Sequence, residues 1–176
     1  MFQTNFIFQT KRYMLSVATI FLLLVSMLLT ACGGAGNVKK DTAQNDKPIE
    51  ITDVTGQKVT LKKPAERVVV QWSASGGAFL TMAALTGKNV TNLIVGIDPS
   101  LSKYRTDMWN HFKADLPELE KIPLIGAVNE KTFDTEKVVS LNPDVIFIPL
   151  YMKEQYESDV KPKLDAAGIP TVYIDY

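Results

Sequence analysis

Four short apolar runs constrain the fold of this chain more than any other feature, because each is too short for a helix and lacks polar alternation. The runs are RVVVQ (67–71), LIVGI (93–97), DVIFI (144–148) and TVYI (171–174). Such β-branched runs are typical of strands buried on both faces, as in parallel sheets. Segments with helical spacing separate or flank them, at 76–86, 101–113, 134–141 and 156–167. Strands that alternate with helices predict a doubly wound α/β domain, with helices on both faces of a mostly parallel sheet.

A small β-hairpin is expected ahead of the main sheet. Two alternating runs, 49–54 and 58–61, flank a turn that contains Gly56. A further short strand is predicted at 124–125, directly after a proline. The hairpin is expected to precede the parallel sheet.

Individual residues mark where the helices begin and end. Gly87 is placed to end the first helix, and Pro162 is expected to break or kink the last one. Asp134 is placed as an N-cap, with Phe133 packed on Val138 as a hydrophobic staple. The inward side of the first helix is expected to consist of Phe79, Met82, Ala83 and Leu85.

The amino terminus has the pattern of a secretory signal. Lys11 and Arg12 are its only charges, and an apolar stretch follows at 14–29. The next residues, Leu-Thr-Ala-Cys, end at Cys32 and resemble the lipobox of bacterial lipoproteins, in which the cysteine carries lipid. The alternative is a membrane-spanning anchor, since the apolar stretch is close to the required length.

The chain therefore divides into a signal peptide (1–31), a lipidated cysteine with a flexible tether (32–48) and a folded body (49–176). Cys32 is the only cysteine, so one thiol cannot form a disulfide or a thiolate metal cluster within the chain. Two or more lipid chains anchor a protein stably. We expect the mature protein at the extracytoplasmic face of the cell membrane, either on an outer surface or in a periplasm.

Composition narrows the choice of partners. The chain has 19 basic and 19 acidic residues, and it stays nearly neutral without Lys11 and Arg12. A nucleic-acid-binding domain shows a basic face, so nucleic acid is not an expected partner. The body is about the size of one domain.

Five stretches of the body resemble one known family in their order and spacing. They are ITDVTGQKVTL, KPAERVVV, ELEKIPLIG, FDTEKVVSLNPDVIFI and LDAAGIPTVYID, distributed over 49–176. The body is similar to the amino-terminal lobe of the Fe/cobalamin periplasmic-binding domain family, the solute-binding proteins of ABC importers for iron–siderophore, haem or cobalamin. Family members hold the ligand between two lobes, so the resemblance implies a single lobe here. We expect either a fragment of a longer protein or a truncated reading frame, because the sequence stops on the last strand of that lobe at Tyr176.

The ligand is expected at the carboxyl ends of the strands, near the point where the strand order reverses. Aromatic rings with polar tips suit a large, partly apolar chelate, and the loops there offer Trp72, Tyr104 and Tyr151. Hydrogen bonds to the ligand are expected from Ser73, Ser75 and Asn129. Cations placed to face an anionic siderophore are Lys103, Arg105 and Lys153. The alternative for each aromatic ring is packing against its own helix.

The resemblance also implies a role for Glu136 in docking to the permease. Family members present one exposed glutamate per lobe to arginines of the membrane permease, and Glu136 stands at that position in FDTEKVVSLNPD. The alternative is that an acid in the first helical turn favours the helix dipole, by about 0.3–1 kcal/mol. His111 is the only histidine and falls in an expected helix. No metal site is expected, since transition metals need several His or carboxylate ligands.

These patterns predict a binding protein and not an enzyme. The sequence contains no G-x-G-x-x-G, P-loop or G-x-S-x-G motif. We expect an extracytoplasmic lipoprotein without a resident cofactor that captures an iron–siderophore complex for an ABC importer. Its partners are then the ABC permease, a small-molecule metal chelate and, through the lipid anchor, the membrane. The alternatives are haem or cobalamin binding in the same transport role, or a single-lobe sensor or interaction lipoprotein without transport.

Overall fold

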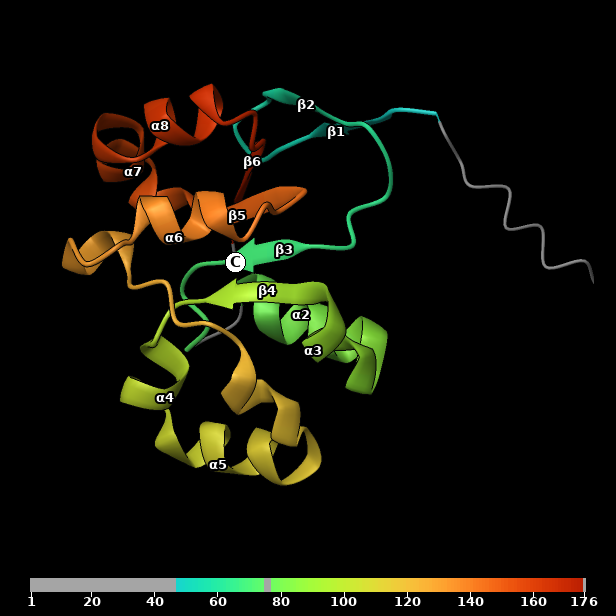
Figure 1. The fold of residues 1–176 in the computed structure, drawn as a ribbon, viewed down its shortest axis with the longest axis vertical. Coiled ribbons are helices and arrows are strands. Elements are labelled where there is room, and N and C mark those ends of the chain that lie inside the picture. The colour runs from blue at the N-terminus through green and yellow to red at the C-terminus, as the bar shows by residue number, and fades with distance from the viewer. Residues whose placement is uncertain (1–46, 75–76, 176) are drawn as a thin grey trace, which may run out of the picture. The chain divides into compact units, whose positions relative to one another are not determined.

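The computed structural model describes residues 47–74 and 77–175 (Figure 1). The strands are β1 Ile49–Thr52, β2 Lys58–Leu61, β3 Val68–Val70, β4 Ile94–Ile97, β5 Val145–Pro149 and β6 Thr171–Ile174. Strands β1 and β2 form an antiparallel hairpin, and the other four form a parallel sheet in the order β4-β3-β5-β6. These strands lie where the four apolar runs and the two alternating runs predict them. The predicted hairpin and doubly wound parallel sheet are confirmed.

Helices and single turns connect the strands. The α-helices are α2 Gly77–Thr86, α3 Val90–Leu93, α4 Ser100–Tyr104, α5 Thr106–Asp115, α6 Thr135–Ser140, α7 Lys153–Asp159 and α8 Lys161–Ala166. The 3₁₀ turns are η1 Gly87–Asn89, η2 Pro117–Lys121, η3 Val128–Glu130 and η4 Leu150–Met152. None of the helices in the described part of the chain is both long and apolar enough to cross a membrane.

The main sheet has an apolar core on each face. Successive residues of a strand point to opposite faces, so Val68 and Val70 of β3 join the first core while Val69 joins the second. The first core is closed by residues from α2, α5 and the hairpin, among them Phe79, Phe112 and Leu61. The second core is closed by residues from α6, α7 and α8, among them Val138, Tyr156 and Leu164. Helices therefore cover both faces of the sheet, as predicted.

Asp53 joins the hairpin to the main sheet. Its carboxylate accepts hydrogen bonds from the backbone N–H groups of Thr55 (2.8 Å) and Gln57 (3.0 Å), which close the hairpin turn. It also accepts one from the N–H of Tyr173 in β6, at 3.3 Å. Burial alone would raise the pKa of Asp53, but the hydrogen bond from the Thr55 hydroxyl (2.6 Å) and those from the backbone N–H groups outweigh burial and hold the pKa below its ordinary value. The ionised carboxylate is thus the form that fixes the hairpin on the sheet.

Both predicted features of the later helices are confirmed. The side chain of Asp134 caps α6 by accepting a hydrogen bond from the N–H of Lys137 at 2.9 Å. Val138 is fully buried, and Phe133 packs on the same core. The last helical stretch is divided into α7 and α8 immediately before Pro162, which has no N–H to continue the helical hydrogen bonds.

The helix predicted at 101–113 is in fact two helices, α4 and α5. Arg105 separates them with φ −132° and ψ 57°, a conformation outside the helical region. Leu101 of α4 and Phe112 of α5 both contribute to the first core. A prediction based on the spacing of apolar residues treats two such helices as one, because a single non-helical residue between them does not change that spacing.

One other local prediction is wrong, and two are right only in part. Leu85 is 80% exposed instead of packing inward, and α2 buries the residues of its first turn, including Phe79. The strand predicted at 124–125 is reduced to one bridge between Leu124 and Ile97. Gly87 has the left-handed φ of +56° expected of a residue that ends a helix, but the chain continues at once into η1 and α3.

Candidate functional site

Three predicted aromatic residues lie together at the carboxyl ends of the parallel strands. The ring centroid of Trp72, after β3, lies 6.1 Å from that of Tyr104 and 6.1 Å from that of Tyr151. Trp72 is half-buried, whereas Tyr104 is 51% and Tyr151 61% exposed. We call these three rings the aromatic edge. It offers solvent an apolar surface with polar tips.

The strand order explains why residues so distant in sequence meet. The chain crosses from β3 to β4 on one side and then returns to β5 on the other side of β3. Ligands of open parallel sheets bind outside this reversal of strand order. In Figure 1, β3 and β4 run toward the side on which α4 lies, and α4 carries Tyr104. The topology thus places the aromatic edge where the sequence rule predicts a binding site.

Trp72 is held in a conformation that few side chains adopt. Its φ is +56°, in the left-handed region, and such conformations persist only where the surrounding structure imposes them. The buried carboxylate of Asp98, which is 2% exposed, provides part of that support. It accepts hydrogen bonds from the N–H of Ser73 at 2.7 Å and from that of Ser100 at 2.9 Å. Asp98 therefore ties the loop after β3 to the loop after β4.

The predicted hydrogen-bonding residues differ in their placement. Ser73 is 0% exposed, and its hydroxyl accepts a hydrogen bond from the N–H of Leu101 at 3.2 Å. Asn129 is exposed on η3, and Ser75 lies outside the described residues. The hydroxyl of Ser73 thus stabilises the loop in this conformation. Ligand contacts by Ser73, Ser75 and Asn129 stay predictions.

Glu130 is a residue at this edge that the sequence does not single out. Its carboxylate oxygens lie 2.9 Å from the ammonium nitrogen of Lys103, and the hydroxyl of Tyr104 donates to it at 2.5 Å. The same ammonium lies 4.9 Å from the ring centroid of Tyr104. The hydrogen bonds that Glu130 accepts from Tyr104 and Lys103 lower the pKa of Glu130. The hydrogen bonds of Lys103 with Tyr104 and Glu130 raise the pKa of Lys103. Both groups therefore stay ionised, and Glu130 orients Tyr104.

The three cations expected to face an anionic ligand are each paired with an acid. Lys103 pairs with Glu130, as described. The guanidinium of Arg105 lies 3.3 Å from Asp107, and the ammonium of Lys153 lies 3.6 Å from Glu157. Exposed pairs of this kind contribute only about 0–1 kcal/mol each, but they cancel the charge that a ligand would meet.

Gln71, the last residue of the first apolar run, holds the neighbouring loop. Its side-chain amide donates to the carbonyl of Gly126 at 3.0 Å and accepts from the N–H of Val128 at 3.0 Å. The side chain is almost fully buried. The sequence signal was a polar residue closing a buried strand, which needs partners in the interior. Gln71 thereby positions the turn that carries Asn129 and Glu130.

Of three other residues considered in the sequence, two are exposed on helices and one lies outside the described part. Glu136 is exposed in the first turn of α6, and His111 is exposed on α5. Cys32 lies outside the described residues. Within 47–74 and 77–175, no three or more His, Cys, Asp or Glu side chains come together as metal ligands.

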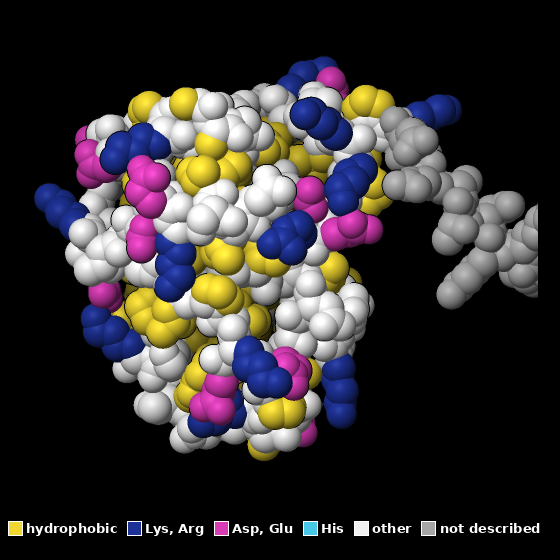
Figure 2. All heavy atoms as spheres, viewed as in Figure 1, with side chains coloured by type: hydrophobic (Ala, Val, Ile, Leu, Met, Phe, Trp, Pro, Cys, Tyr) yellow, Lys and Arg dark blue, Asp and Glu magenta, His cyan; other side chains and the backbone are white. Residues whose placement is uncertain are grey.

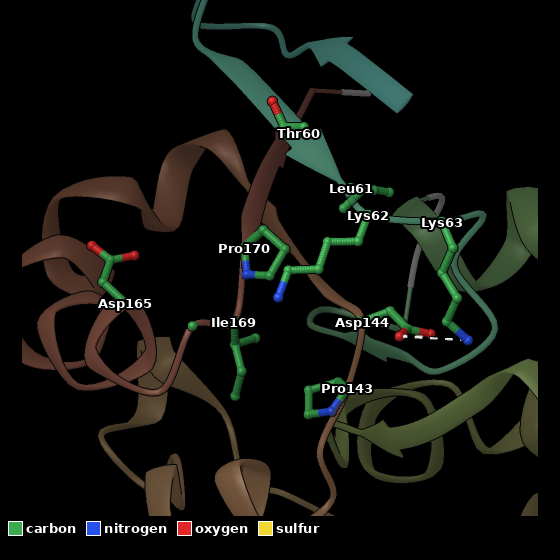
Figure 3. Close-up of a pocket in the computed structure, with 10 residues that line it drawn as sticks. Thr60, Leu61, Lys62, Lys63, Pro143, Asp144, Asp165, Ile169 and Pro170 are labelled. Atoms are coloured by element: carbon green, nitrogen blue, oxygen red, sulfur yellow. Dashed lines mark ion pairs between the residues drawn. The ribbon is translucent and has the colours of Figure 1, made fainter. Parts of the chain in front are cut away.

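A hollow lies at the opposite ends of the strands (Figure 3). It has a volume of about 480 Å³, and its walls come from the end of β2 and from the segments that lead into β5 and β6. Lys62 reaches into this hollow, while Lys63 turns to Asp144, at 4.0 Å. Because ligands of parallel sheets bind at the carboxyl ends, we take the aromatic edge as the candidate site.

Comparison with solved structures places this fold among binding proteins. The chain is similar to FepB from Veillonella parvula, described as a TroA-like periplasmic binding protein, with 65% identity and a TM-score of 0.71 over 73% of this chain. It is also similar to a periplasmic solute-binding protein of the same organism, with 30% identity and a TM-score of 0.58 over 74% of this chain. MolA of Haemophilus influenzae, solved with bound molybdate, shows 26% identity and a TM-score of 0.55 over 72%.

The similarity covers only part of each of those proteins. This chain spans 37% of the length of FepB, 36% of the second protein and 34% of MolA. No protein-family model matches the chain, and no curated protein matches it. The solved structures therefore relate this chain to about a third of a periplasmic binding protein.

Proposed function

We propose that this chain, which is similar to about a third of the TroA-like periplasmic binding proteins, acts as a single lobe of such a protein and contributes to capturing an iron–siderophore complex for an ABC importer. The ligand meets this lobe at the aromatic edge, and a permease at the membrane receives it. The chain acts as a binding protein and catalyses no reaction.

The observation that carries this proposal is the grouping of Trp72, Tyr104 and Tyr151 around the reversal of strand order. Aromatic rings provide large apolar contact areas, and their polar tips make hydrogen bonds. In an iron–siderophore complex the donor oxygens bind the metal and organic groups form much of the outer surface, so the rings have apolar area to contact. A small oxyanion such as molybdate instead needs converging hydrogen-bond donors and cations. Haem and cobalamin are alternative chelates within the same role.

The location and partners complete the proposal. Lipid attached to Cys32 holds the mature protein at the extracytoplasmic face of the membrane, with residues 33–48 as a tether. Glu136 docks on the permease, which its exposure on α6 permits.

Trp72 provides the direct test of chelate binding. The sequence contains two tryptophans, and Trp109 packs on the first core, on the other face of the sheet from the core on which Trp72 packs. In a Trp109→Phe background, we expect ferric siderophores to quench the fluorescence of the full chain in detergent. Trp72→Ala, in the otherwise unchanged chain, should weaken chelate binding measured by calorimetry about tenfold, since an aromatic contact contributes about 0.5–1.5 kcal/mol beyond burial.

Trp109→Phe alone serves as the control and should leave the calorimetric affinity unchanged. Tight haem binding without any response to ferric siderophores would move the assignment to haem. If siderophore, haem and cobalamin all leave Trp72 fluorescence unchanged, the binding role proposed for the aromatic edge is wrong.

Attachment through Cys32 is tested by cell fractionation. Cys32→Ser removes the thiol to which lipid is joined, so we expect the chain to lose its stable membrane association. Ala35→Ser, three residues further along, is the control and should stay with the membrane. Retention of the Cys32→Ser protein as firmly as the parent would show that the apolar stretch at 14–29 spans the membrane instead.

A further inference from the structure

The loops around the aromatic edge carry no net charge. Among the described residues they comprise 71–74, 98–105, 126–131, 150–154 and residue 175, and they contain four basic and four acidic residues. The basic residues are Lys103, Arg105, Lys131 and Lys153, and the acidic ones are Asp98, Glu130, Glu154 and Asp175. Over the face shown in Figure 2, basic and acidic side chains are likewise interspersed and do not gather by sign.

The cation nearest the rings is also the one most closely neutralised. Lys103 lies over the ring of Tyr104, and both oxygens of Glu130 lie 2.9 Å from its ammonium nitrogen. The lowered pKa of Glu130 and the raised pKa of Lys103 keep this pair ionised together at neutral pH. A ligand that rests on Tyr104 therefore meets a neutral pair in place of a free cation.

We propose that the aromatic edge selects metal chelates of low net charge, and that Glu130 sets this preference by neutralising Lys103. This inference rests on the function proposed above and narrows its ligand class. Trivalent iron bound by three singly charged hydroxamate groups gives a neutral complex. The same ion bound by three doubly charged catecholate groups gives a triply negative complex, which gains nothing from a neutral edge.

Ring contact and loss of hydration act differently on the neutral and the triply negative chelate, and this difference decides which of them the edge prefers. Contact with the rings favours both complexes, because it depends on apolar area. Transfer of a triply negative complex from water to a half-buried edge costs hydration energy, and only unpaired cations could offset that cost. Of the four basic residues in these loops, Lys103, Arg105 and Lys153 are each paired with an acid, and the loops as a whole carry no net charge, so the neutral complex is favoured.

Glu130→Gln tests the proposal without removing the contact to Tyr104. The glutamine side-chain oxygen still accepts the hydrogen bond from the Tyr104 hydroxyl, while Lys103 becomes an uncompensated cation. Glu118→Gln is the matched control, because it makes the same change in net charge by releasing Lys121 from a 2.7 Å pair on η2. Only the first variant changes the charge at the aromatic edge.

The full chain in detergent is titrated at low ionic strength with two gallium complexes, a neutral cyclic trishydroxamate and a triply negative tris-catecholate. Gallium is diamagnetic, and the two tryptophans give two indole N–H signals, so Trp72 reports binding while Trp109 serves as the internal reference. We expect the parent to prefer the trishydroxamate. Glu130→Gln should raise affinity for the tris-catecholate about fivefold and change that for the trishydroxamate less than about twofold. Glu118→Gln should match the parent.

Any other outcome of these titrations contradicts either the charge preference, the role of Glu130 or the proposed function. If the parent binds the tris-catecholate more tightly, or if Glu118→Gln acts as strongly as Glu130→Gln, the charge preference is wrong while chelate binding stands. If both complexes bind and Glu130→Gln leaves their ratio unchanged, Glu130 does not set the preference. If neither complex shifts the Trp72 signal in any variant, the charge preference and the proposed function both fail.

Discussion

Gly126→Ala is expected to destabilise the domain by about 4 kcal/mol or more, a loss found only for severe structural conflicts. Gly126 has φ +72°, and an added Cβ would lie well under 3.0 Å from the carbonyl carbon and oxygen of Thr132. That carbonyl belongs to the backbone of a closed loop, in which the Thr132 N–H donates to the carbonyl of Ala127 at 3.1 Å. The loop cannot move aside without losing this bond and the contacts of Gln71. The melting temperature should fall by about 15 °C, or the chain should fail to fold.

Gly168→Ala is the matched control for this prediction. Its φ of +73° is nearly identical, but nothing lies within 4 Å of an added Cβ. The left-handed conformation alone should cost about 1 kcal/mol, so the difference between the variants isolates the collision. Thermal unfolding of the full chain in detergent, followed by circular dichroism, measures both. Equal melting temperatures for the two variants would show that the loop at 126–132 is free to adjust.

The parallel sheet could be predicted from the sequence because its signal is local. The runs RVVVQ, LIVGI, DVIFI and TVYI each reveal their burial by composition alone, and the order of strands and helices restricts the topology to few alternatives. Helix boundaries carry a weaker signal. Arg105 interrupts a helix without any proline or glycine to mark it, and the exposure of Leu85 depends on where the edge of the sheet lies.

The candidate site was predictable where it follows from topology and not where it depends on side-chain partners. Trp72, Tyr104 and Tyr151 meet because strand ends meet, which the strand rule anticipates. Glu130 follows a residue that was predicted, but its pair with Lys103 spans 27 positions of sequence. Nothing local distinguishes such an acid from a solvated one. Whether Lys103, Arg105 and Lys153 face an anionic ligand stays a prediction.

Asp98→Ala is expected to have the second largest effect, about 3 kcal/mol of stability. Asp98 is 2% exposed, and its two oxygens accept from the N–H groups of Ser73 and Ser100 at 2.7 and 2.9 Å. Alanine would leave both donors buried without their acceptor, and each unsatisfied group costs about 1–3 kcal/mol. The left-handed backbone of Trp72 next to Ser73 would lose its support and relax. We therefore expect the indole N–H signal of Trp72 to move or broaden, and chelate affinity to fall about tenfold.

Asp107→Ala supplies the comparison, since Asp107 is an exposed acid on α5 that pairs with Arg105 at 3.3 Å. Removal of an exposed acid usually changes stability by less than about 0.5 kcal/mol, and the Trp72 signal should not move. The stability of Asp98→Asn should fall between those of the two alanine variants. Its side-chain oxygen can still accept the hydrogen bond from the N–H of Ser73, whereas its NH₂ group is a donor and cannot accept one from the N–H of Ser100. Loss of stability in Asp98→Ala with an unchanged Trp72 signal and unchanged affinity would make Asp98 a structural residue only. A combined loss, present in Asp98→Ala and absent in Asp107→Ala, would show that the junction between the loops after β3 and β4 positions the aromatic edge for its ligand.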